Sequence, residues 1–331
     1  MWQSGSIKST MINSRLLAPA KGQGSLEQDM KRSELVSRVA KLYPPLFRSI
    51  FAHSVRGTLP PIHKHWLMRS VAADLFEDQG FPMRGTPYRL NIPKELQSVY
   101  LGCFDFLDHE PLTSRMFKSL LKPGDVVIDV GANIGHYTLL AASVVGPLGR
   151  IHAIECSPGT LALLSNNVAK NRLQNIVIHP FAASDQRGTL PLNVTSIGLS
   201  WFKPHSNWPT VPGSGTSVEV QAVPVDEIVS PPVNLVKIDA EGADLDVLKG
   251  MKRILSESPG VSIIVEWAPP LLTETCKDPL EIIHWLQDAG FSKISVIDEK
   301  NEKHISLDEA VALVRAGKLP HDWVGDLLAQ K

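Results

Sequence analysis

Cysteine is scarce in this chain. Only three of its 331 residues are cysteines, Cys103, Cys156 and Cys276, and they are scattered. Thiols this few and this far apart build neither the disulfide framework of a small secreted domain nor a Cys-x-x-Cys metal site. We therefore expect reduced thiols and a cytoplasmic protein.

An excess of charge of one sign is also missing. The sequence has 33 Lys and Arg residues against 34 Asp and Glu residues, and its basic residues form no stripe. Proteins that bind DNA or RNA usually carry a basic patch or run. The charge balance therefore argues against a nucleic-acid partner.

Long hydrophobic runs are absent as well. No apolar stretch approaches the roughly 18 residues that a membrane-spanning helix needs. Residues 1–24 lack the apolar centre of a secretion signal. The sequence predicts no membrane span and a mobile leader over residues 1–24.

A buried strand, a glycine turn and a helix follow one another in the middle of the chain. Val126–Val130 is a short, β-branched apolar run interrupted by Asp129, which is typical of a strand covered on both faces. Gly131 and Gly135 give the next turn backbone freedom and allow the main chain to approach a ligand. Apolar residues then recur at helical spacing, so we expect the amino end of a helix to point at that ligand.

The glycine spacing indicates which ligand suits this turn. A dinucleotide site uses Gly-x-Gly-x-x-Gly, with one glycine against the pyrophosphate. The corresponding positions are Gly131, Asn133 and His136, so two glycines are missing. A ligand with a ribose and a cationic amino acid but no phosphate suits the rest, which favours S-adenosylmethionine. Asp129 would orient the loop or reach the ammonium group through water.

Glu155 ends a second predicted strand, Ile151–Ile154, and lies twenty residues after Gly135. In a βαβ unit, an acidic residue at this place meets the ribose hydroxyls. The alternative is a cap or a solvated charge at a strand end. Ser157 and Pro158 then predict a helix start, with the serine side chain capping the free amides.

A third segment, Ala183-Ser184-Asp185, follows a strand predicted over 175–179. Its small residues would let an adenine ring lie flat against the chain, while the carboxylate accepts a hydrogen bond from the exocyclic amine. An ordinary polar turn explains the same residues.

The segment 234–243 brings Lys237, Asp239 and Glu241 to the carboxyl end of an apolar strand. This is the crevice in which open α/β sheets bind ligands. The alternative is a salt-bridged loop in which the lysine neutralises the carboxylates.

Together these segments resemble one known family. The stretches VIDVGANIGHYT, IEC, AASD and above all LVKIDAEGADLDVLKG are similar to FkbM-type S-adenosylmethionine-dependent methyltransferases, which mostly methylate hydroxyl oxygens of small molecules and sugars. The similarity runs from about Leu121 to Phe291, and it implies that Asp239 and Glu241 face the methyl-transfer site. With Tyr137 and Ala183 from the same segments, the predicted cofactor-binding residues are Asp129, Gly131, Asn133, Gly135, Tyr137, Glu155, Ala183, Ser184 and Asp185.

Methyl transfer to a neutral hydroxyl benefits from a base, which contributes roughly 10²- to 10⁴-fold. Asp239 is the first candidate for this base and Glu241 the second. Lys237 would lower the pKa values of these carboxyls or orient one of them. His136 is another candidate base, although packing or capping explains its position in the first helical turn.

Magnesium is an alternative use of the same carboxylates. Asp239, Glu241 and Glu266 could hold Mg²⁺ and, through it, a pair of acceptor hydroxyls. The sequence does not show that these side chains converge. We therefore expect S-adenosylmethionine as the cofactor and do not favour a metal.

The order of elements predicts an α/β protein with a Rossmann-like class I methyltransferase fold. We expect a mostly parallel seven-stranded sheet with helices on both faces, including helices over 243–255 and after a cap formed by Ser306 and Glu309. A mostly helical region precedes it, with one helix over 25–43. The predicted parts are a leader (1–24), an N-terminal accessory region (25–110), the methyltransferase domain (111–300) and a C-terminal strand and helix extension (301–331).

The acceptor is the least determined partner. We expect a small molecule or a glycan, with the aromatic-rich loop 195–215 as a candidate acceptor loop and Trp267 either as a pocket wall or as a core residue. The accessory region would cover the acceptor pocket or form homodimer contacts. The alternatives are an acceptor group on a protein or nucleic acid, methylation of nitrogen or carbon, and a noncatalytic binding protein.

Overall fold

The computed structural model describes residues 80–93, 109–194, 200–202, 217–274, 277–321 and 323–331. The chain divides into two units. The first comprises Met1–Gly85 and Asn91–Asp108, and β1 (Phe81–Pro82) is its one element within the described residues. The second unit holds the elements discussed below, beginning with β2 (Arg89–Leu90). The predicted leader, the helix over 25–43 and most of the loop 195–215 lie outside the described residues.

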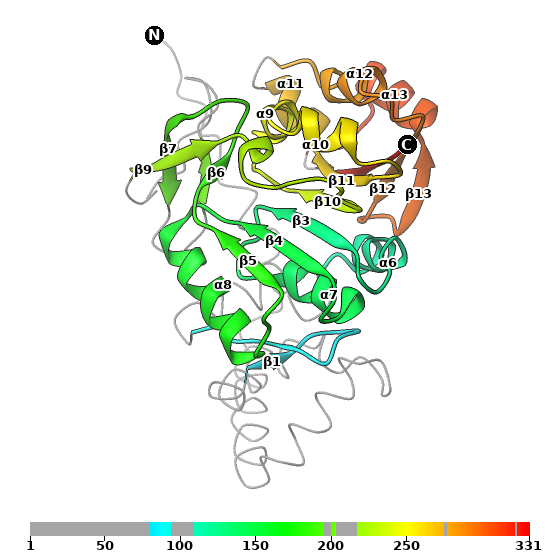
Figure 1. Ribbon diagram of the computed structural model, residues 1–331. Helices are drawn as coiled ribbons and strands as arrows, with labels where there is room; N and C mark the ends of the chain where they lie inside the picture. The colour runs from blue at the N-terminus through cyan, green and yellow to red at the C-terminus, as the bar shows by residue number, and fades with distance from the viewer. Residues whose placement is uncertain (1–79, 94–108, 195–199, 203–216, 275–276, 322) are drawn as a thin grey trace, which may run out of the picture. The chain divides into compact units, whose positions relative to one another are not determined.

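A mixed eight-stranded sheet forms the centre of the second unit (Figure 1). Its strand order is β13-β12-β14-β11-β10-β3-β4-β5. The strands from β11 to β5 are parallel, whereas β14 is antiparallel to both of its neighbours. The bounds are β3 (Val126–Val130), β4 (Arg150–Ile154), β5 (Ile176–His179), β10 (Leu235–Ile238), β11 (Ser262–Trp267), β12 (Lys293–Asp298), β13 (Lys303–Ser306) and β14 (Gly325–Gln330).

Helices cover both faces of this sheet. One core lies beneath α6 and α7, and a larger core lies beneath α9, α10, α12 and α13. The bounds are α6 (Pro111–Ser119), α7 (His136–Val145), α8 (Pro158–Lys170), the 3₁₀ turn η3 (Val225–Glu227), α9 (Asp244–Lys249), α10 (Lys252–Glu257), α11 (Pro269–Glu274), α12 (Glu281–Asp288) and α13 (Leu307–Arg315). The Rossmann-like α/β arrangement predicted from the sequence is confirmed.

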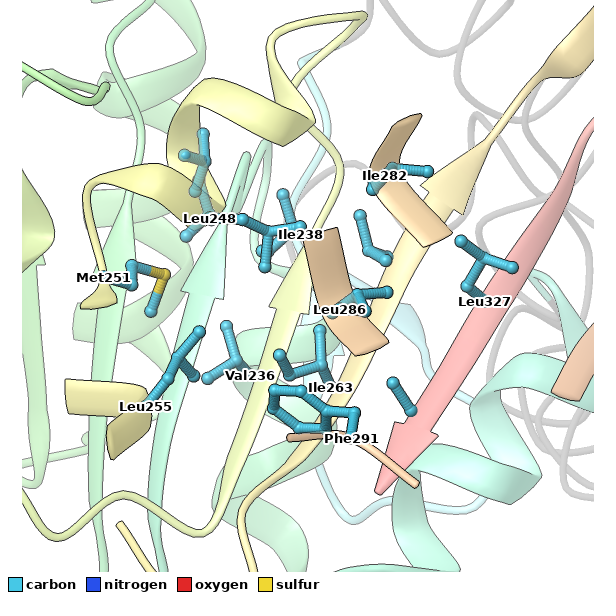
Figure 2. Close-up of a cluster of buried hydrophobic side chains, with 14 of the residues drawn as sticks. Val236, Ile238, Leu248, Met251, Leu255, Ile263, Ile282, Leu286, Phe291 and Leu327 are labelled. Atoms are coloured by element: carbon cyan, nitrogen blue, oxygen red, sulfur yellow. The ribbon is translucent and has the colours of Figure 1, made fainter. Parts of the chain in front are cut away.

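Alternation along β10 divides its side chains between the two cores. Val236 and Ile238 join the larger core, where Figure 2 shows them beneath Leu248. Leu235 belongs to the core beneath α6 and α7. Successive side chains of a strand point to opposite faces, so Lys237 shares the face of Leu235.

A smaller sheet follows β5 and has the order β6-β9-β7-β8. The bounds are β6 (Ala182–Ala183), β7 (Gly188–Val194), β8 (Ser200–Phe202) and β9 (Ser217–Val223). Strands β7 and β9 pair in antiparallel register. This sheet begins next to the residues proposed to meet adenine.

Some details differ from the sequence predictions. The main sheet has eight strands instead of seven, and β13 and β14 come from the segment 301–331. The helix predicted over 243–255 is two short helices, α9 and α10. The helix is interrupted at Gly250, where a Cβ atom would lie 1.9 Å from the carbonyl oxygen of Ser184. The cap of α13 by Ser306 is confirmed, since its side chain accepts a hydrogen bond from the amide of Glu309.

Within the described stretches, none of the helices is both long and apolar enough to cross a membrane. Cys156 is the one cysteine that lies among the described residues, and it is not in a disulfide.

Candidate functional site

The glycine turn lies against the end of the neighbouring strand β10. Gly131 and Gly135 have φ angles of +75° and +101°, and Asn133 between them has a φ of +50°. A Cβ atom on Gly131 would lie 1.9 Å from the carbonyl oxygen of Asp239. Glycine is therefore required at position 131, both for the backbone conformation and for the close approach of the two strand ends.

Asp129 is buried and orients the helix that follows the turn. Its carboxylate accepts a hydrogen bond of 2.5 Å from the hydroxyl of Thr138 in α7. Burial raises the pKa of Asp129 to about 6, against the lowering effects of Thr138 and Lys237. Of its two predicted uses, the geometry favours orientation of the loop.

Glu155 braces the turn from the end of β4. Its two carboxylate oxygens accept hydrogen bonds from the amides of Asn133, at 2.9 Å, and Ser157, at 2.7 Å. Burial raises the pKa of Glu155 to about 7, although these amides oppose the rise. Each carboxylate oxygen has a second lone pair, so the group can still accept bonds from two hydroxyls.

The predicted side-chain cap at Ser157 is wrong. The residue stands at the N-cap of α8, but its side chain makes no capping hydrogen bond, and its buried hydroxyl has no hydrogen-bond partner in the structure. The neighbouring Glu155 accepts from the amide of Ser157 instead. The carboxylate, rather than the serine, organises the start of this helix.

A cavity of about 480 Å³ begins at the predicted adenine segment. Ala183 and Ser184 are buried at its edge, while Asp185 is exposed and accepts a 3.4 Å hydrogen bond from the Ser184 hydroxyl. The cavity continues past Glu241 and α9 to Glu266. The structure thus brings the third predicted segment and Glu241, from the loop after β10, to one hollow.

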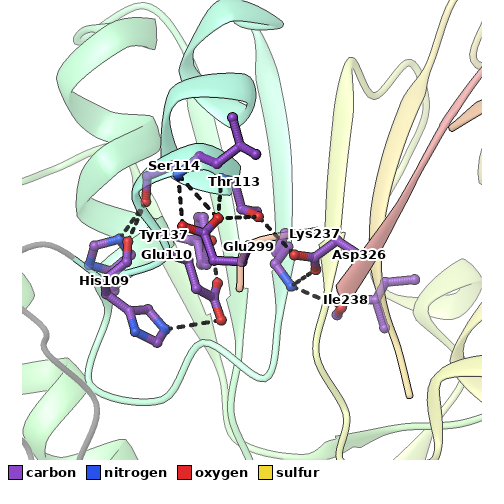
Figure 3. A network of polar contacts seen from close by, with 11 residues as sticks. His109, Glu110, Thr113, Ser114, Tyr137, Lys237, Ile238, Glu299 and Asp326 are labelled. Atoms are coloured by element: carbon purple, nitrogen blue, oxygen red, sulfur yellow. Dashed lines mark hydrogen bonds and ion pairs between the residues drawn. The ribbon is translucent and has the colours of Figure 1, made fainter. Parts of the chain in front are cut away.

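Lys237 does not pair with the carboxylates that follow it in the sequence. Its ammonium is 3.1 Å from the carboxylate of Asp326 in β14 and lies over the ring of Tyr137, 5.3 Å from the centroid. Figure 3 shows this pair between β10 and β14. Burial lowers the pKa of Lys237, but Asp326 and Asp239 outweigh that effect and raise it above its ordinary value. The lysine is a fixed cation beneath the site.

Three carboxylates at the strand ends are unengaged. In the described part of the chain, the side chains of Asp239, Glu241 and Glu266 accept no hydrogen bond and form no ion pair. By contrast, Asp244 accepts from the amides of Ala240 and Gly242. A carboxylate that the protein leaves without a donor is available to a ligand.

The electrostatic surroundings give these three carboxyl groups different pKa values. Burial raises the pKa of Asp239 to about 6, with Lys237 opposing and Glu110 adding to the rise. Desolvation, followed by the carboxylates of Asp239 and Asp244, raises the pKa of Glu241 further, to about 8, and the pKa of Glu266 is raised well above its usual range by burial and by Asp239. Asp239 is therefore the member of this group that is mostly ionised at neutral pH.

Glu110 is a site residue that the motif analysis did not identify. It precedes α6 with a φ of +43°, and its carboxylate accepts a 2.6 Å hydrogen bond from the hydroxyl of Tyr137 (Figure 3). The predicted cofactor residue Tyr137 is thus engaged with Glu110 and packed under Lys237. Pro111 in the sequence signals a helix start, but it gives no hint that the preceding glutamate reaches the turn.

The remaining predicted residues, His136 and Trp267, serve mainly in packing. His136 is buried and contacts the Ser114 hydroxyl at 3.0 Å, and burial lowers its pKa to about 3. The indole of Trp267 donates to the carbonyl of Pro279 and packs edge-on against Trp323, so this tryptophan is mainly a core residue. Among the described residues, no group of three or more His, Cys, Asp or Glu side chains is arranged to hold a metal ion.

This set of groups fits S-adenosylmethionine. A buried carboxylate with free acceptor capacity stands where a ribose would lie, a glycine turn brings backbone close to the ligand, and unengaged carboxylates stand at the adjacent strand end. None of these features is a phosphate cradle of the dinucleotide type.

Comparison with known proteins supports this interpretation. The family model described as "Methyltransferase FkbM domain" matches residues 129–293. The chain is 27% identical over 186 residues to the 31-O-demethyl-FK506 methyltransferase FkbM of Streptomyces tacrolimicus, covering 46% of this chain and 71% of that protein. It is 29% identical over 146 residues to the hexuronic acid methyltransferase AglP of Haloferax volcanii, covering 43% of this chain and 56% of that protein.

Among solved structures, the methyltransferase FkbM from Methylobacillus flagellatus aligns with 80% of this chain and 59% of its own, at 17% identity and a TM-score of 0.42. The matched family region begins at Asp129, inside β3, and ends at Lys293, the first residue of β12, so it contains the glycine turn, Glu155, the cavity and the acidic strand ends. The chain belongs to the FkbM-type family of S-adenosylmethionine-dependent methyltransferases.

Proposed function

We propose that this protein transfers a methyl group from S-adenosylmethionine to a hydroxyl oxygen of a small molecule or a sugar. The observation that carries the proposal is the position of Asp239, which follows β10 directly. Its backbone carbonyl lies against Gly131 of the glycine turn, and its carboxylate is unengaged. Bound S-adenosylmethionine supplies an electrophilic methyl group on a sulfonium. The protein must then align an acceptor oxygen, exclude water and remove one proton.

The proposed cofactor contacts follow the three strand ends. Glu155 accepts hydrogen bonds from the ribose hydroxyls with the acceptor capacity that its two amide bonds leave. Ser184 and Asp185, at the edge of the cavity, receive the adenine. Gly131, Asn133 and Gly135 bring the backbone to the remainder of the donor.

Asp239 is the proposed base. A base must be unprotonated before the reaction, and the pKa of Asp239, raised to about 6, leaves it mostly ionised at pH 7. The higher pKa of Glu241 makes it the second candidate. Lys237 acts as a positioning residue, because it limits the rise in the pKa of Asp239 while its ammonium is bonded to Asp326.

The names of the relatives support a hydroxyl acceptor. One relative is named as a 31-O-demethyl-FK506 methyltransferase, which specifies an oxygen, and another as a hexuronic acid methyltransferase, which specifies a sugar acid. The part of the cavity lined by Glu241 and Glu266 is the proposed acceptor site. No observation on the described residues favours a protein or nucleic-acid acceptor over this one.

The direct test measures methyl transfer and donor binding separately. Purified protein is incubated with isotopically labelled S-adenosylmethionine and a panel of polyketides, glycosides and sugars, and products are identified by mass. Asp239→Asn should lower kcat by roughly 10²- to 10⁴-fold, while calorimetry shows an unchanged Kd for S-adenosylhomocysteine. In the wild-type enzyme, kcat should rise with pH through a midpoint near 6, where the base loses its proton.

The matched control is Asp308→Asn, which changes an exposed carboxylate in the first turn of α13 that does not line the cavity. This variant should keep both rate and affinity. Equal loss of turnover and donor binding in Asp239→Asn would remove Asp239 from the role of base, and a wild-type protein that binds no S-adenosylhomocysteine would remove the proposed function.

A further inference from the structure

The backbone at the site holds unusual conformations at residues other than glycine. Among the described residues, five that are not glycine have positive φ angles, and three of them, Glu110, Asn133 and Glu241, stand at the ends of the site elements. Asparagine tolerates this conformation, but glutamate rarely adopts it. Backbone strain of this kind clusters at functional sites. Glu110 is the member of this group for which no role follows from the motifs.

The carboxylate of Glu110 reaches the amino end of α7. One of its oxygens accepts from the Tyr137 hydroxyl at 2.6 Å, and the other lies 3.5 Å from Nε2 of His109. Tyr137, whose contact with Glu110 is drawn in Figure 3, is two residues after Gly135, so Glu110 lies close to the glycine turn. Its side chain is 29% exposed, so Glu110 is not sealed off from the site.

Glu110 also differs from the other acids of the site in its charge. Burial acts to raise the pKa of Glu110, but His109, Lys237 and the Tyr137 hydroxyl outweigh it and hold the pKa at about 2. Asp129, Glu155, Asp239 and Glu241 all have raised pKa values. Glu110 therefore carries a full negative charge throughout the neutral range, which suits a cationic partner.

We propose that Glu110 binds the ammonium group of the methionyl part of S-adenosylmethionine. The inference rests on the proposed function and extends it to a residue outside the family match. The turn beside Glu110 is the part of the donor site that neither the ribose nor the adenine contacts use. A carboxylate in that place pairs with the donor's ammonium through a charge-assisted hydrogen bond.

The test uses two ligands that differ in the group concerned. S-adenosylhomocysteine carries the amino acid part, whereas 5′-methylthioadenosine keeps adenine, ribose and sulfur but has no ammonium. In Glu110→Gln, calorimetry should show Kd for S-adenosylhomocysteine raised about ten- to hundredfold, which is the usual contribution of a hydrogen bond to a charged group. Kd for 5′-methylthioadenosine should stay within about twofold of wild type.

Two further variants separate binding from a purely structural role. Glu299→Gln alters another carboxylate of the same network, which caps α6 by accepting from the amides of Leu112 and Thr113, and it should leave both affinities unchanged. Tyr137→Phe removes the hydroxyl contact of Glu110 but keeps its charge, so it should cost less affinity than Glu110→Gln. Glu110→Asp serves as the second variant if Glu110→Gln does not fold, with the same selective loss expected.

The proposal is overturned if Glu110→Gln weakens both ligands equally, weakens neither, or is matched in full by Tyr137→Phe. A wild-type protein that binds neither ligand refutes the proposed function itself. Wild-type binding of both ligands with no selective loss in Glu110→Gln refutes only the role of Glu110.

Discussion

Lys237 and Asp326 form a buried pair whose partners come from distant parts of the sequence. Both side chains are almost fully buried, and the ammonium also donates to the carbonyl of Ile238. The Thr113 hydroxyl donates to the second oxygen of Asp326 at 2.9 Å. A buried charge pair is costly to desolvate, and removal of one partner leaves the other charge uncompensated.

We expect Lys237→Met to lower the free energy of unfolding by about 3 to 5 kcal/mol, because Asp326 would remain buried without its counter-charge. The double variant Lys237→Met with Asp326→Asn should lose less than the single variant. Urea unfolding followed by circular dichroism measures both. Lys249→Met is the control: its ammonium lies 3.6 Å from Glu281 in a partly exposed pair, and it should cost about 0 to 1 kcal/mol. Additive losses in the double variant would contradict the pairing.

Single residues were predicted from the sequence only where a local pattern carries the information. The place of Glu155 near the glycine turn is predicted from its spacing of twenty residues after Gly135. In the structure its carboxylate accepts a hydrogen bond from the amide of Asn133. The partner of Lys237 could not be predicted, because Asp326 is 89 residues away. The role of Glu110 could not be predicted from the sequence, because its hydrogen bond with Tyr137 depends on how α6 packs beside α7.

At the scale of elements, the site depends on the contact between the turn after β3 and the end of β10. The two strands are parallel neighbours, with Asp129 in register with Lys237. The missing side chain of Gly131 allows the carbonyl of Asp239 to approach it. The position of the proposed base is thus determined by a residue in the turn after a neighbouring strand.

Gly131→Ala should therefore abolish measurable donor binding and destabilise the protein by more than the strain of its backbone alone. Gly260→Ala is a matched control, because Gly260 has a φ of +74° against +75° for Gly131, yet nothing lies within 4 Å of the added Cβ atom. The control should lose about 1 kcal/mol of stability from backbone strain and keep full donor affinity. Thermal unfolding and calorimetry compare the two. Equal effects would show that the contact with Asp239 is unimportant.

The elements themselves were predicted well where hydrophobic periodicity is strong. β3 has the predicted bounds, and β4 and β5 lie within one residue of theirs, since apolar runs mark them. The division of the predicted helix 243–255 into α9 and α10 was not foreseen, because it depends on the contact of Gly250 with Ser184. A helical pattern does not reveal such a contact between distant segments.

At the scale of the whole second unit, the last strand holds the sheet together. β14 lies between β11 and β12 and is paired with both, from Gly325 to Gln330 on one side. The sequence Gly-Asp-Leu-Leu-Ala-Gln does not alternate, and both partners lie earlier in the chain. A sequence pattern predicts that strands exist far better than it predicts their order in a sheet.

Deletion of residues 325–331 should leave β11 and β12 with unpaired edges and bury Lys237 without its anion. We expect the shortened protein to aggregate or to lose its near-ultraviolet circular dichroism, because exposed strand edges associate. Gln330→Ala is the control, since it keeps the backbone pairing and should remain folded. A deletion variant with a native spectrum and normal donor binding would contradict this role of β14.

The place of β14 has a consequence for synthesis of the protein. Asp326 supplies the anion for Lys237, and Lys237 in turn limits the pKa of Asp239. A nascent chain that has already produced the glycine turn and the acidic strand ends still lacks this anion. The charges of the methyl-transfer site are therefore balanced only after residues 325–330 have left the ribosome. The site becomes able to function at the same time as β14 completes the sheet.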